Sequence, residues 1–236
     1  MRHDLPQPAK WGVSGTLIPL PGGHRNRVYR VDGDDLRVVF KSTTRDRAAV
    51  EWLEEVHALA RRAGFTVPAF VRSADGNLID GGWTCEHFVP GRPLTQPELR
   101  DIARPIDRFH ASASDLAQRP GFLSAVDLIE APAGGDVDLT AVPAGLVELC
   151  RDAWRAVADQ SMAIVHGDLN PSNLLATATG EVALLDWDEC RRDLTLFDLG
   201  ALGRDDELSR RARLAWEIAC SWTAEPDYAR RIAARL

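Results

Sequence analysis

Hydrophobic and polar positions alternate in short runs through residues 1–89, and this period of two is typical of strands. Strands are expected at residues 13–20, 27–31, 36–41, 69–73, 77–80 and 83–89. Residues 46–62 instead repeat their hydrophobic side chains every three or four positions, as an amphipathic helix does. The N-terminal part is therefore predicted to be a small antiparallel sheet with one helix.

After a linker rich in Pro and Gly at residues 90–93, the pattern becomes mainly helical. Helices are expected at residues 96–116 (with an interruption at Pro105), 144–159, 205–222 and 226–236. Residues 119–143 are rich in Gly, Pro and Asp and are predicted to form a long loop that is available for substrate contacts. The predicted fold class is α+β, with an N-terminal lobe at residues 1–89 and a C-terminal lobe at residues 90–236.

Composition excludes several classes of protein. The net charge of −7 argues against a nucleic-acid binder, which normally carries a basic surface. No run approaches the ~20 apolar residues of a membrane span, and residues 1–11 lack the apolar run of a signal peptide. The four cysteines are far apart and show neither zinc-ligand nor disulfide spacing. We expect a cytoplasmic protein that binds neither nucleic acid nor membrane.

One lysine stands out in a chain that uses arginine almost everywhere. Lys10 and Lys41 are the only lysines among 28 basic residues, and Lys41 ends a predicted strand. A compact ammonium is a point charge that the planar fork of arginine does not imitate. The order of strand, Gly22-Gly23 turn, strand, hairpin and strand ending in lysine is how the N-lobe of a kinase covers and grips ATP phosphates. Such a lysine needs a helix glutamate as its partner; Glu51 is our prediction, and spacing leaves Glu55 open.

The candidate chemistry lies in two loops that follow short hydrophobic runs. The first loop contains His166-Gly167-Asp168 with Asn173 five positions after the aspartate, and the second contains Asp186-Trp187-Asp188. The catalytic loop of protein kinases has the same Asp-to-Asn spacing and a later metal-binding aspartate. Asp168 is therefore the predicted catalytic base, while Asn173 and Asp186 are predicted oxygen ligands of Mg²⁺. The sequence leaves open whether Asp188 points away or helps to bind metal or substrate.

In a kinase-like architecture the adenine lies at the junction between the lobes. Residues 86–89 precede the linker and would form this hinge. Glu86 and Phe88 are therefore predicted to lie on the nucleotide side of the site.

Three motifs carry a resemblance to a known family: His166-Gly-Asp168-Leu-x-x-x-Asn173, Leu184-Leu185-Asp186-Trp187-Asp188 and Phe197-Asp198-Leu199-Gly200. They resemble the aminoglycoside phosphotransferases and the related choline kinase-like small-molecule kinases. Gly22-Gly23-x-x-Asn26 resembles the phosphate loop of that family, so Asn26 is predicted to lie at the nucleotide phosphates.

The resemblance implies a protein-kinase-like fold with two lobes. It also implies ATP or GTP with Mg²⁺, and transfer of the γ-phosphoryl group to a hydroxyl of a small molecule. That acceptor would be an antibiotic such as an aminoglycoside, with a role in resistance, or an amino alcohol or a sugar. Asp198 would brace residues 166–173, called the catalytic loop below, and His166 would orient backbone.

Two other interpretations compete with that of a small-molecule kinase. A protein kinase shares the same core parts, but residues 187–197 leave little space for an activation segment that docks a peptide. A nucleotide-binding module without turnover would be favoured if Asp168 or Asp186 were replaced, and both are present.

Overall fold

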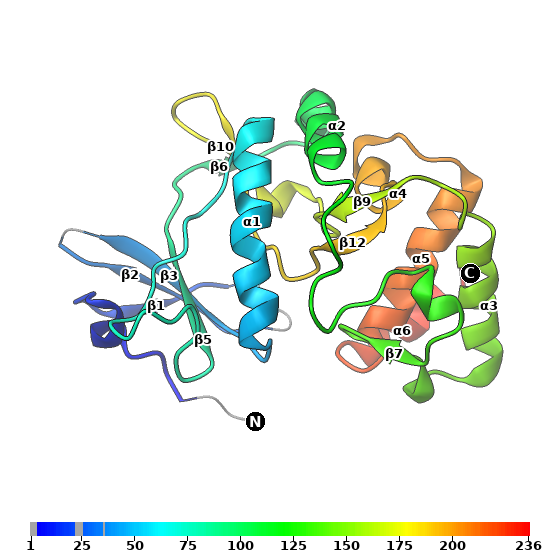
Figure 1. Ribbon diagram of the computed structural model, residues 1–236, viewed down its shortest axis with the longest axis horizontal. Helices are drawn as coiled ribbons and strands as arrows, with labels where there is room; N and C mark the ends of the chain where they lie inside the picture. The colour runs from blue at the N-terminus through cyan, green and yellow to red at the C-terminus, as the bar shows by residue number, and fades with distance from the viewer. Residues whose placement is uncertain (1–3, 22–25, 35) are drawn as a thin grey trace.

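The computed structural model describes residues 4–21, 26–34 and 36–236. Its N-terminal part is a four-stranded antiparallel sheet in the order β1-β2-β3-β5 (Figure 1). The strands are β1 (Leu17–Pro19), β2 (Val28–Asp32), β3 (Arg37–Ser42) and β5 (Trp83–His87). The predicted sheet is confirmed, although only β1 remains of the strand expected at residues 13–20.

The two faces of this sheet have different roles. Phe40 of β3 is fully buried and lies opposite Cys85 of β5. Trp83 points to the same side as Cys85, because alternate residues of a strand share a face, and the three form part of a small core. Lys41 lies directly opposite Thr84 of β5 and therefore points to the other side. Glu86 is two positions further along β5, so it shares the face of Lys41.

Two predicted strands, at residues 69–73 and 77–80, are wrong. The chain makes only isolated bridges there, Phe70↔Glu86 and Asp80↔Trp83. Gly76 between the two segments and Gly81 after the second both have a positive φ, so the chain turns at each of them and no continuous ladder forms.

Helix α1 (Arg47–Ala63) confirms the helix predicted at residues 46–62, and it ends at Gly64, whose φ of 105° is left-handed. Figure 1 shows α1 between the sheet and the rest of the molecule. Its buried face, which includes Leu53, shares a hydrophobic core with Phe109 and Trp187 of the C-terminal part. The lobe boundary after residue 89 stays a prediction, while α1 itself packs with residues beyond it.

The C-terminal part combines helices with short strands. The α-helices are α2 (Ala103–Ser112), α3 (Ala144–Arg155), α4 (Leu196–Leu199), α5 (Glu207–Ser221) and α6 (Pro226–Ala233). The remaining strands are β4 (Phe65–Thr66), β6 (Arg92–Pro93), β7 (Ala133–Gly134), β8 (Val137–Asp138), β9 (Met162–Val165), β10 (Leu174–Ala176), β11 (Val182–Leu184) and β12 (Arg191–Leu194). One sheet has the order β4-β11-β10-β6; β12 pairs with β9, and β7 with β8.

Short 3-10 helices complete the chain, at Pro8–Trp11, Glu98–Ile102, Asp127–Ile129, Leu139–Ala141, Pro171–Asn173 and Gly200–Leu202. The helix expected at residues 96–116 is divided into the 3-10 helix at Glu98–Ile102 and α2. The division precedes Pro105, which lies in the first turn of α2, where a missing N–H interrupts no intrahelical bond. In the described ranges, no helix combines the length and the apolar character that crossing a membrane requires.

Candidate active site

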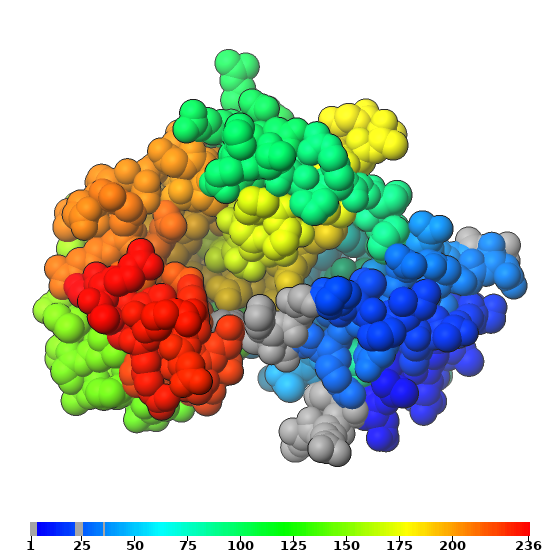
Figure 2. Space-filling view, turned by 180° about the vertical axis from the view of Figure 1, so that it is seen from behind, coloured from blue at the N-terminus to red at the C-terminus, as the bar shows by residue number. Residues whose placement is uncertain are grey.

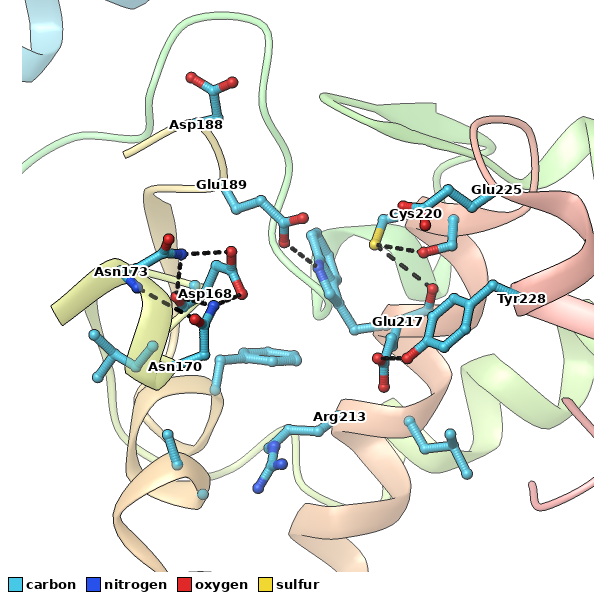
Figure 3. Close-up of a pocket in the computed structure, with 18 of the residues that line it drawn as sticks. Asp168, Asn170, Asn173, Asp188, Glu189, Arg213, Glu217, Cys220, Glu225 and Tyr228 are labelled. Atoms are coloured by element: carbon cyan, nitrogen blue, oxygen red, sulfur yellow. Dashed lines mark hydrogen bonds between the residues drawn. The ribbon is translucent and has the colours of Figure 1, made fainter. Parts of the chain in front are cut away.

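Strand β9 delivers the predicted base. Asp168 follows β9 by three residues, is exposed, and lines a cavity. Two amides hold its carboxylate, since Asn173 Nδ2 donates to Oδ2 at 2.8 Å and Asn170 Nδ2 donates to Oδ1 at 3.0 Å (Figure 3). Asn170 also caps the 3-10 helix that contains Asn173, accepting from backbone N–H groups, so one short turn positions all three side chains.

A buried aspartate braces this loop from behind. Asp198 accepts hydrogen bonds from the backbone N–H groups of His166 and Gly167 and from the His110 ring Nε2, each at 2.9 Å. Burial alone would raise the pKa of Asp198, but these bonds and the neighbouring histidines hold it below its usual range. The His166 ring pairs with the carbonyl oxygen of Leu185 at 2.8 Å, which joins the catalytic loop to the end of β11. Asp198 and His166 thus have the bracing and orienting contacts that the family resemblance implied.

Residues 186–190, called the metal loop below after the predicted Mg²⁺ ligand Asp186, follow β11, and Asp186 and Asp188 of this loop face Lys41. Lys41 Nζ is bonded to the Asp186 carboxylate and lies 3.1 Å from Asp188 Oδ2. The Asn26 amide donates to Asp188, so this aspartate points toward the predicted phosphate site and not away from it. Burial would lower the pKa of Lys41, but Asp188 and Asp186 raise it above its ordinary value. The structure therefore brings together Lys41 of β3, Asn26 just before β2, and the two aspartates of the metal loop.

Glu51 lies elsewhere. Its carboxylate is 3.6 Å from Arg47 Nε on the exposed side of α1, and Glu55 is exposed too. Within the described ranges, Lys41 forms its ion pairs with aspartates of the metal loop and with neither glutamate. The hydrophobic stripe of α1 decides this, because burying that stripe turns the glutamates outward. The partnership of Glu51 with Lys41 stays a prediction.

The other nucleotide-side residues lie around the same sheet. Glu86 is part-buried near Lys41, and burial raises the pKa of its carboxyl to about 7 against the opposing effect of Lys41. The ring of Phe88 carries the guanidinium groups of Arg30 and Arg37 at 5.4 and 5.3 Å. The backbone N–H of Phe88 already donates to the carbonyl of Arg37, at 2.9 Å. The hinge role of residues 86–89 stays a prediction. Gly22 and Gly23 lie outside the described residues.

A cavity of about 1340 Å³ extends from Asp168 to helices α5 and α6. Figure 2 shows a hollow between these C-terminal helices, in orange and red, and the yellow-green segment of the catalytic loop. The far wall includes Glu189, which accepts from the indole N–H of Trp216 at 3.4 Å, and Glu217, which accepts from the Tyr228 hydroxyl (Figure 3). These side chains line the same cavity as Asp168.

Comparison with known protein families identifies this arrangement. Residues 16–232 match the model of the phosphotransferase enzyme family. The chain belongs to this family. A comparison with curated protein sequences gave no match.

Solved structures support the kinase-like fold of this phosphotransferase. A microcompartment-associated aminopropanol kinase matches with a TM-score of 0.63 and 16% identity, over 96% of this chain and 91% of the other. Choline kinase LicA from Streptococcus pneumoniae matches with a TM-score of 0.63 and 13% identity, over 94% of each chain. Spectinomycin phosphotransferase APH(9)-Ia, in complex with ADP and spectinomycin, gives 0.57 and 11%, over 94% and 85%. The predicted fold class and the identification as a phosphotransferase are confirmed.

The side-chain oxygens available in the cavity of this phosphotransferase fit a metal ion that arrives with a nucleotide. Across the part of the chain that the structure describes, no three His, Cys, Asp or Glu side chains form a metal cluster. Asn173 and Asp186 nevertheless both line the cavity beside Asp168. Mg²⁺ characteristically takes only one or two protein oxygens and completes its shell with phosphates and water. These two residues therefore suit Mg²⁺.

The sequence did not single out three residues of the far wall, Glu189, Trp216 and Tyr228. Glu189 directly follows the Asp186-Trp187-Asp188 motif, which was a usable signal. Trp216 and Tyr228 lie on helices whose spacing predicts burial but not which cavity they border.

Proposed function

We propose that this phosphotransferase moves the γ-phosphoryl group of ATP or GTP, with Mg²⁺, to a hydroxyl of a small molecule. The observation that supports this most strongly is the position of Asp168. Its carboxylate is oriented by Asn170 and Asn173 and lies in one cavity with Lys41 and Asp186 on the donor side. Asp168 would orient the acceptor hydroxyl and take its proton as the loose transition state collapses.

The residues on the nucleotide side of the site, the donor side, would bind the phosphates mainly through charge. Lys41 holds its ammonium between Asp186 and Asp188, where incoming phosphates would compete for it. Asn173 and Asp186 would hold Mg²⁺, which neutralises charge on the phosphate oxygens when bound. Asn26, bonded to Asp188, lies where the phosphate loop is expected.

For the acceptor we propose an alcohol that also carries an amine, such as an amino alcohol or an aminoglycoside, ahead of a neutral sugar. Glu189 and Glu217 stand on the wall facing Asp168, and each is oriented by an aromatic donor. The names of similar structures, an aminopropanol kinase and a choline kinase, support the same class. An aminoglycoside acceptor would give the protein a role in antibiotic resistance.

The deciding experiment measures ADP or GDP release over a panel of amino alcohols, aminoglycosides and sugars, with ATP and GTP in turn. Asp168→Ala is expected to lower turnover with the best acceptor at least about a hundredfold while nucleotide affinity is retained. Turnover near that of the wild type would show that Asp168 is not the base. Nucleotide binding without release over the whole panel would instead favour a module without turnover.

A further inference from the structure

Arg119 is a buried cation that is bonded to backbone rather than to carboxylates. It is 1% exposed, and the described hydrogen bonds of its guanidinium go to four carbonyl oxygens. Nη1 donates to those of Trp187, Asp188 and Cys190 at 3.2, 2.8 and 3.1 Å. Nε donates to Ala49 in the first turn of α1 at 3.0 Å. Three of the four acceptors thus belong to the metal loop.

The surroundings hold this guanidinium firmly. Its carbon lies 4.4 Å from the centre of the Phe122 ring, and Arg45 lies 4.7 Å from the same ring. Gln118 adds two bonds to the next part of the chain, donating to the carbonyl of Arg192 at 2.8 Å and accepting from its N–H at 2.9 Å. Gln118 and Arg119 together therefore bind the backbone of residues 187–192, directly after Asp186.

That segment needs external support. In the described ranges, Asp186 is the one residue other than glycine with a positive φ, at 60°. Residues with a side chain are uncommon there, although aspartate tolerates this region better than most, and such a conformation persists where the surrounding structure supports it. The carbonyls that follow Asp186 converge on one Arg119 nitrogen, which keeps this turn closed. Lys41 then reaches Asp186 and Asp188 together.

We propose that Arg119 is a positioning residue that holds the metal loop in the conformation in which Asp186 binds Mg²⁺, and that it links this loop to the start of α1. The inference rests on the proposed function, because it assigns Mg²⁺ to Asp186. Arg119 begins the loop of residues 119–143, for which the sequence predicted substrate contacts. The inference instead gives this residue a role at the metal side of the site. Residues that orient metal ligands in this way commonly change metal affinity by about 10- to 100-fold when they are replaced.

The test measures binding rather than turnover. A fluorescent ATP analogue is titrated onto the full chain in EDTA and then at rising MgCl₂, and thermal unfolding is recorded in parallel. Arg119→Met is expected to raise the Mg²⁺ concentration at half-effect about 10- to 100-fold, with affinity in EDTA within about twofold of the wild type. Arg119→Lys keeps the charge but not the fork, and is expected to shift the same midpoint by a smaller factor.

Arg108→Met is the matched control. Arg108 also ties α1 to the C-terminal part, but its described hydrogen bonds reach only the Ala63 carbonyl, at 3.1 and 2.6 Å. It is expected to lower the melting temperature without moving the Mg²⁺ midpoint. A wild-type midpoint in the Arg119 variants, or an equal shift in Arg108→Met, overturns the inference.

Arg119→Lys alone decides the outcome if Arg119→Met does not fold. A wild-type chain whose nucleotide binding ignores Mg²⁺ would refute the proposed function and the inference with it. A wild-type response that the Arg119 variants leave unchanged would refute only the inference.

Discussion

Replacing Glu86 by Gln is expected to remove a pH dependence of folding stability. Glu86 lies on β5 on the face that carries Lys41. Burial raises the pKa of its carboxyl from 4.5 to about 7, because the loss of hydration outweighs the attraction of Lys41. The negative charges of Asp188 and Asp186 add to this rise in the pKa.

The sign and size of the effect follow from proton binding. Between pH 4.5 and about 7, the folded chain keeps a proton on Glu86 that the unfolded chain releases. The free energy of unfolding therefore falls as the pH rises through this range, and stays lower above it. This pKa change corresponds to about 3 kcal/mol. Because Gln cannot titrate, Glu86→Gln is expected to gain about 3 kcal/mol on the wild type between about pH 4 and about pH 8.

The assay is urea unfolding at several pH values, in EDTA and without nucleotide. The quantity compared is the difference between variant and wild type, so that carboxylates common to both chains cancel. Glu51→Gln is the control for the loss of one carboxylate, because Glu51 is exposed and its described ion pair is with Arg47, at 3.6 Å. A Glu86→Gln curve parallel to that of the wild type would refute the reasoning.

Three further predictions concern the bracing, donor and acceptor sides of the site. Asp198→Asn should lower the free energy of unfolding by about 3–5 kcal/mol in urea, since it leaves buried donors without an anionic acceptor, and a loss under about 1 kcal/mol would contradict this bracing role. Because the pKa of Asp198 is depressed in the folded chain, the difference between variant and wild type should shrink as the pH falls below 3.8. Lys41→Met should weaken ATP binding at least about tenfold in calorimetry, and unchanged affinity would exclude a phosphate role. Glu217→Gln should raise KM for an amine acceptor but not for ATP, and equal changes would place Glu217 outside the acceptor site.

The sequence predicts the position of a site residue best where neighbours in sequence are also neighbours in space. Asp168 and Asn173 share one turn, and Asp186 directly follows a short strand, so spacing alone placed them. Glu51 depends on how α1 rotates, and that rotation is set by a hydrophobic stripe that packs against Phe109 and Trp187, far along the chain. No local pattern contains that information.

Arg119 illustrates a second limit. A composition rich in Gly, Pro and Asp identified residues 119–143 as a loop, which is correct for most of its length. The partners of Arg119 are backbone carbonyls of the metal loop and of α1. Every residue has a backbone carbonyl, so the amino-acid types of the partner residues do not reveal such contacts, and the sequence could not predict them.

The segment between Asp186 and Asp198 also bears on the kind of acceptor. Strand β12 occupies part of it and pairs along its whole length with β9, from Arg191 opposite Val165 to Leu194 opposite Met162. Asp193 of this strand is buried, accepts a hydrogen bond from the backbone N–H of Ala125 at 3.1 Å, and pairs with Arg191 of the same strand at 2.7 Å. An activation loop that docks a peptide must be free to order and disorder, and a strand bonded beside the catalytic loop is not. The cavity that Asp168 shares with α5 and α6 is where we propose that a small-molecule acceptor binds instead.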